Sequence, residues 1–296
     1  QMTPDGDFPT VQSPNPDNVE TLALALEQAR RSDADLLLAS DPDADRLSAA
    51  CRDERGEWVL LDGHQTCMLL FHYLLEMHRF RKDNPTHAFL IKTIVTTDIV
   101  RAMAEDYGVA VEETYIGFKW IAQVLREREG KGIFWGGAEE SYGFLAEDFA
   151  RDKDAVSAAV LMAEAALWAK SQGCTLYQQM MALYVKYGYT ETALVSLHKP
   201  GQAGAQEIRA MMAHFREQPP TSIADAPIVC LRDYQNLRQY DAEGQVTPLN
   251  MPASSNIIQW LAADGTKVSL RPSGTEPKIR FYIEVKSQMD TPEDYF

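Results

Sequence analysis

Three aspartates stand at alternate positions of one short polar loop. Asp41, Asp43 and Asp45 follow directly on residues 35–40, an apolar run with the length of a buried strand. A tight loop at that point would aim several carboxylates at one spot, and carboxylate oxygens are the ligands that Mg²⁺ prefers. Arg46 comes next, and a cation beside three carboxylates indicates a second, anionic ligand. We therefore expect a divalent metal site in this aspartate loop (residues 41–46), with a solvated acidic turn as the alternative.

Two other acidic motifs do not fit the aspartate loop. An EF-hand needs glycine at loop position 6 and glutamate at position 12, but counting from Asp41 both positions hold arginine. A phosphatase of the haloacid dehalogenase type has threonine or valine two residues beyond its second aspartate. Counting from Asp41 that position is Asp45, and counting from Asp43 it is Leu47. Both motifs are therefore excluded.

A second polar loop, the arginine loop (residues 271–277), lies near the end of the sequence. Here Arg271 is followed closely by Ser273, Gly274 and Thr275. Arginine offers planar bidentate donors, the hydroxyls add neutral ones, and glycine lets backbone N–H groups approach an oxyanion closely. This composition is typical of a phosphate-binding loop, and an ordinary turn between two strands is the alternative.

A third polar loop, the glutamate loop (residues 139–143), lies between these two in the sequence. It contains Glu139, Glu140 and Ser141, whose oxygens can accept hydrogen bonds from sugar hydroxyls. Taken alone, the same residues are compatible with a polar surface loop or with the start of a helix.

The segments that must position these loops alternate between helical and extended patterns, which predicts an α/β fold. In chain order we expect a helix at 18–31, strands at 35–40 and 47–51, a helix from Gly63, a strand at 89–95, a helix at 98–107, a strand at 133–135, a loop at 136–143 and a helix at 154–170.

After about Gly188 the pattern changes to a polar stretch with shorter extended runs. We expect strands near 228–230 and 255–258 and a closing strand at 278–285, which together predict a separate C-terminal α+β domain. The sequence thus divides into three expected domains, each carrying one polar loop: residues 1–60, 61–187 and 188–296.

Composition limits the classes of protein and of partner. At 296 residues with 45% hydrophobic content the chain can bury two or three cores. Lys and Arg total 28 against 43 for Asp and Glu, so the net charge is −15, which would repel nucleic acids and anionic membranes. We expect neither as a partner, and we expect local basic residues to capture any anionic substrate.

The cysteines and the absence of long apolar runs bear on location. Four cysteines are scattered without a CxxC pair or a histidine at zinc spacing, and we expect all of them to be reduced: Cys51, Cys67, Cys174 and Cys230. No signal-like segment and no apolar run long enough to span a bilayer is present. We therefore predict a cytoplasmic location, unless a signal lies upstream of the sequence.

Taken together and in this order, the three loops resemble those of the α-D-phosphohexomutase family. The family's metal-binding loop is similar to residues 41–46, its sugar-recognition loop to 139–143 and its phosphate-binding loop to 271–277. Shorter matches lie at 117–119 and 151–154. Three motifs in register are far more specific than any one of them.

The resemblance implies roles for individual residues. It implies Mg²⁺ as cofactor, and it implies that the glutamate loop binds the 3- and 4-hydroxyls of the sugar while the arginine loop grips whichever phosphate is not reacting. The implied metal ligands are Asp41, Asp43 and Asp45, the implied catalytic residues are Arg46 and Lys153, and the implied substrate-binding residues are Lys119, Glu139, Ser141, Arg271, Ser273, Gly274 and Thr275.

In the family, a phosphoserine donates its phosphate to the substrate, the bisphosphorylated sugar turns over in the cleft, and the other phosphate returns to the serine. The resemblance therefore implies sugar phosphates as substrates and glucose 1,6-bisphosphate as activator or intermediate. Family members have four domains, with the serine in the first. The sequence contains no Ser-His-Asn-Pro stretch, since the similar Ser13-Pro14-Asn15-Pro16 lacks the histidine.

The resemblance thus implies a partial second domain, a complete third α/β domain and a fourth α+β domain with a fold like that of the TATA-binding protein. The N-terminal domain of the same protein, with the phosphoserine, is then an expected partner. An open sheet edge in the partial domain would allow homo-oligomers to form by strand pairing.

The implied activity is that of an intramolecular phosphotransferase, a phosphoglucomutase or phosphomannomutase, with this chain alone inactive. The sequences of the glutamate and arginine loops are closer to the glucomutase branch than to the aminosugar branch. A phosphopentomutase of the same superfamily is the nearest alternative. A non-catalytic sugar-phosphate-binding protein and a metal-dependent phosphatase are alternatives from other classes.

Overall fold

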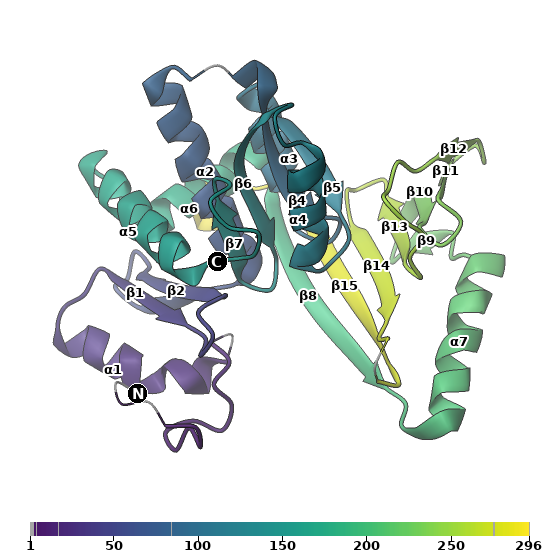
Figure 1. The fold of residues 1–296 in the computed structure, drawn as a ribbon, viewed down its shortest axis with the longest axis horizontal. Coiled ribbons are helices and arrows are strands. Elements are labelled where there is room, and N and C mark those ends of the chain that lie inside the picture. Colours follow the sequence, from purple (N-terminus) through teal and green to yellow (C-terminus); the bar gives the residue numbers. More distant parts are fainter. Residues whose placement is uncertain (1–2, 4, 17, 84, 275, 296) are drawn as a thin grey trace. The chain divides into compact units, whose positions relative to one another are not determined.

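The chain folds as two compact units (Figure 1). A computed structural model describes residues 3, 5–16, 18–83, 85–274 and 276–295. The first unit comprises Gln1–Tyr187 and Met289–Phe296, and the second comprises Gly188–Gln288.

A small antiparallel sheet lies at the start of the first unit. Its strands pair in the order β1-β2-β3, with bounds β1 (Leu36–Ser40), β2 (Leu47–Arg52) and β3 (Trp58–Leu61). Before it come a 3-10 helix, η1 (Val19–Leu22), and α1 (Ala23–Arg31). The helix packs on the sheet through Ala29, which lies in one apolar cluster with Leu37 and Ala50. The aspartate loop is the connection between β1 and β2.

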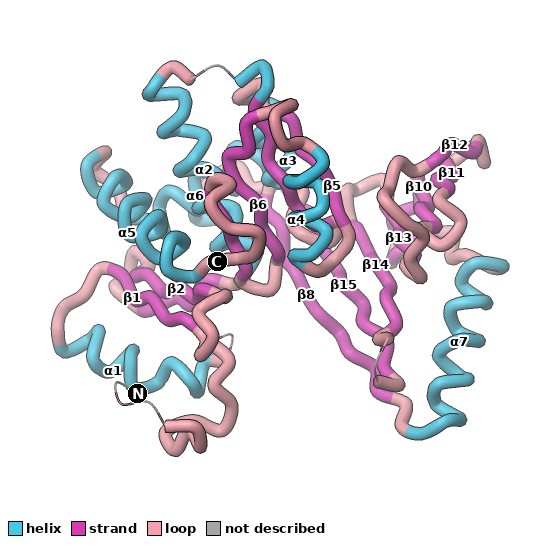
Figure 2. The backbone as a smooth tube through the Cα atoms, viewed as in Figure 1, coloured by secondary structure: helices cyan, strands magenta, loops and turns pink. Residues whose placement is uncertain are grey.

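A second, four-stranded sheet forms the centre of the first unit. Its strands, magenta in Figure 2, pair in the order β5-β4-β6-β7. Strand β4 is parallel to β5 and β6, and β7 is antiparallel to β6. The strand bounds are β4 (Ala88–Thr93), β5 (Ala110–Thr114), β6 (Ile133–Glu139) and β7 (Gly143–Ala146). The helices are α2 (Gly63–Arg81), α3 (Ile99–Asp106), α4 (Phe118–Glu127), α5 (Ala155–Ser171) and α6 (Leu176–Tyr187), and a 3-10 helix, η2 (Pro85–His87), precedes β4.

Helices cover both faces of this sheet. On one face Ile121 of α4 packs with Phe89 and Phe134 of the strands. On the other face lies α2, because a Cβ atom built on Gly136 would meet Leu74 of α2 at 3.1 Å. The central strand β4 is therefore buried on both sides, which is why residues 88–91 read as a continuous apolar run.

Local capping fixes where two of the helices begin. Asp62 accepts a hydrogen bond from the Gln65 backbone N–H at 2.7 Å, and the Gln65 side chain accepts one from Asp62 N at 3.0 Å, a capping box that starts α2. Asp154 accepts hydrogen bonds from the backbone N–H groups of Val156 and Ser157 and so starts α5. Both helices begin next to the polar loops.

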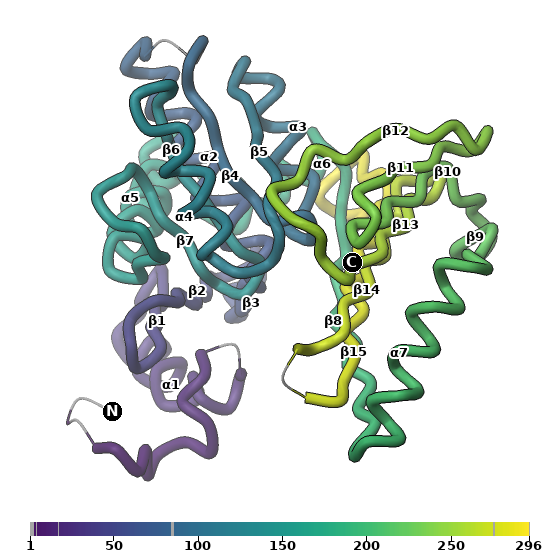
Figure 3. Tube along the Cα trace, turned by 45° about the vertical axis from the view of Figure 1, so that its right-hand side comes forward, coloured from purple at the N-terminus to yellow at the C-terminus, as the bar shows by residue number. Residues whose placement is uncertain are grey.

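The second unit is an antiparallel sheet with one long helix, α7 (Gly201–Glu217). The strand order is β12-β11-β10-β13-β14-β15-β8, with the short β9 paired to β10 (Figure 3). The strand bounds are β8 (Tyr189–His198), β9 (Ser222–Ile223), β10 (Ala226–Asp233), β11 (Arg238–Asp241), β12 (Val246–Pro248), β13 (Ile258–Ala262), β14 (Lys267–Pro272) and β15 (Lys278–Ser287). Ile208 and Met212 of α7 pack on Trp260 and Leu270 of the sheet.

The C-terminal segment belongs to the first unit. It contains a 3-10 helix, η3 (Pro292–Tyr295), whose Tyr295 ring is stacked on that of Tyr184 in α6, with ring centroids 6.4 Å apart. Tyr177 of α6 also contacts the Tyr295 ring, edge to face.

Three expectations from the sequence need correction. The region 136–143 was expected to be a loop, but β6 continues through Glu139, so only residues 140–142 connect β6 to β7. The run 255–258 is mostly not strand, since β13 begins at Ile258. The polar stretch after Gly188 contains the 17-residue helix α7. The alternation of helices and strands in the first unit is confirmed.

Two further findings concern the described residues alone. None of their helices is both long enough and apolar enough to cross a membrane. All four cysteines are free thiols, as expected.

Candidate functional site

The aspartate loop brings its three carboxylates close together. Ligand oxygens of Asp41, Asp43 and Asp45 all lie within 4.8 Å of one another. The turn is tight because Ala44 takes a positive φ of 56° and its N–H donates to the Asp41 carbonyl at 3.1 Å. Asp41 Oδ1 accepts the backbone N–H groups of Asp45 and Arg46 at 3.0 and 2.9 Å. The buried Asp41 carboxylate thus organises the loop.

Two cations pair with the carboxylates of Asp41 and Asp45. Arg46 Nε lies 2.6 Å from Asp41 Oδ2 and 3.5 Å from Asp45 Oδ1, and Lys153 Nζ lies 2.7 Å from Asp45 Oδ2. Burial tends to raise the pKa of Asp41, but hydrogen bonds from the Arg46 backbone and from neighbouring side chains hold this pKa below its usual value. Burial raises the pKa of Asp45, against the opposing effect of Lys153. A proton therefore goes to Asp45 before Asp41.

The donor set fits a divalent cation. Asp45 Oδ1 is buried and accepts no hydrogen bond from any residue that the structure describes. A buried, unbonded carboxylate oxygen beside two other carboxylates matches the hard oxygen ligands that Mg²⁺ takes.

The glutamate loop connects β6 to β7. Glu139, the last residue of β6, is buried, and its Oε1 accepts a hydrogen bond from Gly117 N at 2.6 Å. Burial, followed by the charge of Glu140, raises the pKa of Glu139 to about 7, despite the opposing Gly117 N–H and Lys153. Ser141 is exposed. Glu139 therefore titrates near neutral pH, where it can either donate or accept a hydrogen bond.

Backbone hydrogen bonds join the glutamate loop to the aspartate loop. Leu47 N donates to the Tyr142 carbonyl at 2.9 Å, and Arg46 forms an isolated β-bridge with Gly143. Ala155 N, at the start of α5, donates to the Ala44 carbonyl at 3.0 Å. The two loops, far apart in the sequence, thus form one polar region in the first unit.

Lys153 lies at the junction of these two loops. Its ammonium group pairs with Asp45, while its side chain passes so close to Gly143 that an added Cβ there would lie 2.5 Å from Lys153 Cδ. Glycine at position 143 thus leaves room for the lysine. The structure brings together the expected residues of the aspartate loop, the glutamate loop and Lys153.

Lys119 belongs to a neighbouring region of the same unit. It is exposed in the first turn of α4, with its Nζ 5.1 Å from the ring centroid of Trp120. It is coupled to the glutamate loop through Gly117, the cap of α4, whose N–H binds Glu139.

The arginine loop connects β14 to β15 in the second unit. Ser273 N donates to the Lys278 carbonyl at 2.8 Å, and Glu276 N donates to Ser273 Oγ at 3.3 Å. A Cβ on Gly274 would meet nothing within 4 Å, so the space beside this glycine is open. The expected residue Thr275 lies outside the described residues.

Comparisons with known proteins match this arrangement of loops along the chain. Three domain models of phosphoglucomutase/phosphomannomutase match: alpha/beta/alpha domain II over residues 1–56, alpha/beta/alpha domain III over 62–187, and the C-terminal domain over 232–291. The chain belongs to the phosphoglucomutase/phosphomannomutase family. The expected second, third and fourth domain types of the phosphohexomutase fold are thereby confirmed.

Individual relatives agree with this result. A phosphoglucomutase of Staphylococcus aureus (strain N315) is 36% identical over 286 residues, which are 97% of this chain and 51% of the relative. A phosphoglucomutase of Staphylococcus haemolyticus is 35% identical over 95% of this chain and 50% of the relative. The chain therefore spans about half the length of these relatives.

A solved structure shows the same fold. The phosphoglucomutase/phosphomannomutase family protein of Burkholderia thailandensis is similar with a TM-score of 0.61 at 16% identity, over 96% of this chain and 49% of that one.

One candidate residue of this family member was missed in the sequence. Arg280 on β15 stands directly opposite Arg271 on β14, so both side chains lie on the same face of the sheet. Arg280 Nε is buried and has no hydrogen-bond partner among the described residues. The sequence did contain a signal for this residue. Lys278 and Arg280 stand two positions apart after the arginine loop, and this spacing places both cations on the same face of β15.

Proposed function

We propose that the chain supplies the metal, sugar and distal-phosphate sites of a phosphohexomutase that interconverts hexose 1-phosphate and hexose 6-phosphate. The observation that carries this proposal is the junction of the aspartate and glutamate loops, where Lys153 reaches Asp45 beside the buried Glu139. A cluster of carboxylates next to a sugar-recognition loop is what phosphoryl transfer to a sugar hydroxyl needs, because this chemistry is catalysed by positioning and by charge neutralisation.

In this proposal Asp41, Asp43 and Asp45 hold Mg²⁺, which would neutralise negative charge on the oxygens of the transferring phosphoryl group. Arg46 lies against the same carboxylates and is placed to bind a phosphate that approaches the loop. Lys153 pairs with Asp45 in this structure, and it would be free to bind the phosphate of the substrate if a metal ion took over that carboxylate.

The other loops orient the sugar. Glu139 and Ser141 are proposed to bind hydroxyl groups of the hexose, with Lys119 beside them. Arg271, Ser273, Gly274 and Thr275 are proposed to bind the phosphate that is not reacting, and we add Arg280 on the strength of its place opposite Arg271. A fixed clamp on the distal phosphate would let the sugar bind in two orientations, one for each direction of the reaction.

Three further statements complete the proposal. The domains divide at 1–60, 61–187 and 188–296. The phosphate donor is a serine outside these 296 residues, since no Ser-His-Asn-Pro stretch occurs among them. Glucose phosphates are the preferred substrates and glucose 1,6-bisphosphate the intermediate, supported by the name phosphoglucomutase of relatives that are 36% identical.

Ligand titration of the 296-residue chain tests the proposal. With Mg²⁺ present, glucose 6-phosphate should bind more tightly than inorganic phosphate, because the glutamate loop adds contacts to the sugar. Ser141→Ala should reduce that difference, whereas Ser171→Ala, at the exposed end of α5, should not. Equal affinity of the wild-type chain for the two ligands contradicts the proposal.

A coupled assay tests the reaction itself. With glucose 1-phosphate, Mg²⁺ and a trace of the 1,6-bisphosphate, the chain alone should stay at background. Turnover that is abolished by mutating a serine within these residues contradicts the proposed donor. Net release of inorganic phosphate identifies a phosphatase instead.

A further inference from the structure

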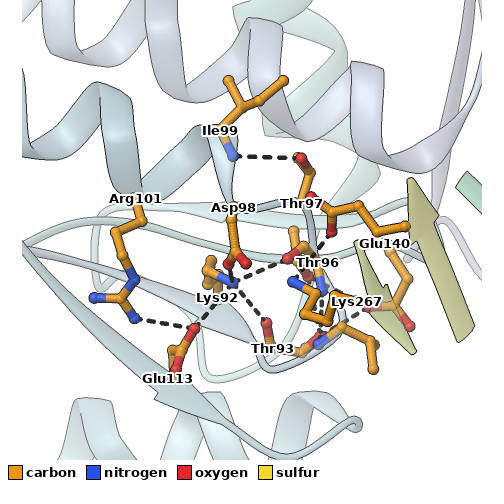
Figure 4. A network of polar contacts seen from close by, with 12 residues as sticks. Lys92, Thr93, Thr96, Thr97, Asp98, Ile99, Arg101, Glu113, Glu140 and Lys267 are labelled. Atoms are coloured by element: carbon orange, nitrogen blue, oxygen red, sulfur yellow. Dashed lines mark hydrogen bonds and ion pairs between the residues drawn. The ribbon is translucent and has the colours of Figure 1, made fainter. Parts of the chain in front are cut away.

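Glu140 stands between the two residues proposed to bind the sugar, yet its own carboxylate is held by the protein. Glu140 Oε2 accepts hydrogen bonds from Thr93 Oγ1 at 2.9 Å and from Thr96 Oγ1 at 3.3 Å (Figure 4). Both threonines are fully buried at the carboxyl end of β4. The side chain of Glu140 therefore ties the glutamate loop to the neighbouring strand.

The threonine turn is itself fixed by a buried lysine. Lys92 is fully buried, and its Nζ donates to the carbonyl oxygens of Thr96 at 2.9 Å and of Thr93 at 3.4 Å. The same ammonium group pairs with Asp98 Oδ1 at 2.8 Å and with Glu113 Oε1 at 3.1 Å (Figure 4). The turn that carries the hydroxyls of Thr93 and Thr96 is therefore held in place by Lys92, which binds the carbonyl oxygens of the same two residues.

The buried ammonium group of Lys92 has carboxylate partners that carry opposite charge. Burial alone would raise the pKa of Glu113, but Lys92 and Arg101 lower this pKa to about 2. Arg101 forms its own ion pair with Glu113 at 2.9 Å. Glu113 is therefore ionised at neutral pH, and the buried ammonium group has a permanent partner.

The backbone of the glutamate loop is held from the side of α2 as well. A Cβ on Gly63 would lie 1.7 Å from the Glu140 carbonyl oxygen, so α2 approaches the loop as closely as a glycine allows. Cys67 Sγ donates to the Glu139 carbonyl at 3.3 Å. With its side chain held by β4 and its backbone held by α2, Glu140 has little freedom to move.

We infer that Glu140 is a positioning residue, which rests on the proposed function of this loop: held by the hydroxyls of Thr93 and Thr96, it sets the orientation of Glu139 and Ser141 toward the sugar. It does not touch the sugar itself. Because Glu139 and Ser141 are bonded directly to Glu140, holding the side chain and the backbone of Glu140 restricts the directions in which both neighbouring side chains can point.

Paired threonine variants of the 296-residue chain test this inference. The double variant Thr93→Val and Thr96→Val keeps the shape of both side chains but removes both hydroxyls. It should weaken glucose 6-phosphate binding by about tenfold or more, the usual cost of losing hydrogen bonds to a charged group. Binding of inorganic phosphate should stay within about twofold, because the arginine loop supplies it.

Two matched variants serve as controls. Thr66→Val makes the same change at a buried threonine whose hydroxyl has no hydrogen-bond partner among the described residues, and it should bind both ligands as the wild type does. The single variant Thr93→Ser keeps the hydroxyl and should retain most of the wild-type affinity for glucose 6-phosphate. Should the double variant not fold, Thr96→Val alone removes only the longer bond and must show the same selective loss at smaller size.

The outcomes separate the two proposals. Glucose 6-phosphate binding by the double variant that equals that of Thr66→Val overturns the positioning role and leaves the proposed function intact. An equal loss of both ligands also overturns it, because a general structural defect would then explain the data. A wild-type chain that binds glucose 6-phosphate no better than inorganic phosphate overturns the proposed function, and the positioning role with it.

Discussion

The aspartate and glutamate loops of the first unit differ from the arginine loop of the second in whether their charged side chains have partners within the protein. In the first unit Arg46 pairs with Asp41, Lys153 pairs with Asp45, and the Gly117 N–H donates to Glu139. In the second unit Arg271 and Arg280 stand opposite each other, and like charges in that position repel. Among the described residues neither arginine has an acidic partner within ion-pair distance.

This difference indicates which kind of ligand each region is suited to bind. In the first region Asp41 and Asp45 already pair with Arg46 and Lys153, so a metal ion that binds these two carboxylates competes with the two cations. A region of two facing arginines gains most when an anion enters between them, because the anion relieves their repulsion. The first region is thus built for exchange of cations and the second for capture of an anion.

The largest contrast expected is between two glycines, one in each region. Gly63→Ala would place a Cβ 1.7 Å from the Glu140 carbonyl oxygen, whereas Gly274→Ala would meet nothing within 4 Å. Alanine is otherwise the better helix former in α2, so any loss at position 63 reports the close approach. We expect Gly63→Ala to lower the free energy of unfolding of the first unit by about 3 kcal/mol.

Thermal unfolding of both variants measures this contrast. Gly274→Ala should leave stability within about 0.5 kcal/mol of the wild type, as for an unconstrained surface position. Equal midpoints for the two variants would show that α2 and the glutamate loop are not in the contact described.

The second prediction concerns pH and the glutamate loop. In the folded chain burial and the charge of Glu140 raise the pKa of Glu139 to about 7, from the ordinary glutamate value of 4.5. The folded state therefore binds more protons than the unfolded state between these values, and stability must fall as pH rises from about 4.5 to about 7. The full effect is on the order of 3 kcal/mol at most.

Urea unfolding at pH 5 and at pH 8, without Mg²⁺, tests the sign of this effect. The wild type should be less stable at pH 8 by an amount that Glu139→Gln removes, because glutamine does not titrate. Glu140→Gln should reduce the difference in part, since Glu140 contributes to the raised pKa. A variant Glu139→Gln with the same pH dependence as the wild type would rule out Glu139 as the titrating group.

The third prediction concerns the anion site of the second unit. Arg271→Ala should weaken binding of inorganic phosphate by roughly tenfold to a hundredfold, because a charge-assisted bidentate contact is lost. Arg280→Ala should also weaken the binding of inorganic phosphate. The exposed Arg238→Ala in the same unit is the matched control and should bind phosphate normally. Isothermal titration gives the three affinities, and equal values for all would remove the phosphate assignment.

Much of this comparison was predictable from the sequence, and the exceptions have physical causes. The three loops and the alternating elements of the first unit follow from local patterns, which single sequences carry well. Gly136 and Gly137 suggested a loop, but they lie in β6 because helices pack closely on both faces: a Cβ at Gly137 would meet Ile121 at 2.9 Å. Such close approach depends on residues distant in sequence.

Two further features needed the fold. The helix α7 is mostly exposed and buries only a narrow stripe that includes Ile208 and Met212, so its sequence reads as polar. The family resemblance gives a role to Glu139, but residue type and position alone give Glu140 no separate role, since both residues are acidic and adjacent. The difference between them comes from Thr93 and Thr96, which reach the loop only because β4 and β6 are neighbours in the sheet.

The smallest effect expected sharpens the idea of cation exchange in the aspartate loop. Lys153 Nζ lies 2.7 Å from Asp45 Oδ2, on a side chain that is 18% exposed, and so competes with a metal ion for that carboxylate. Lys153→Met keeps the packing of the side chain beside Gly143 but removes the charge. Mg²⁺ should then bind up to about fivefold more tightly, a gain set by the modest strength of partly exposed ion pairs.

Lys119→Met removes an equal charge that makes no such pair with the aspartates and should leave Mg²⁺ affinity within about twofold. Titration of the chain with Mg²⁺ decides between these cases. Weaker binding in Lys153→Met than in the wild type would mean that the lysine supports the metal site instead of competing with it, and the proposed exchange would have to be abandoned.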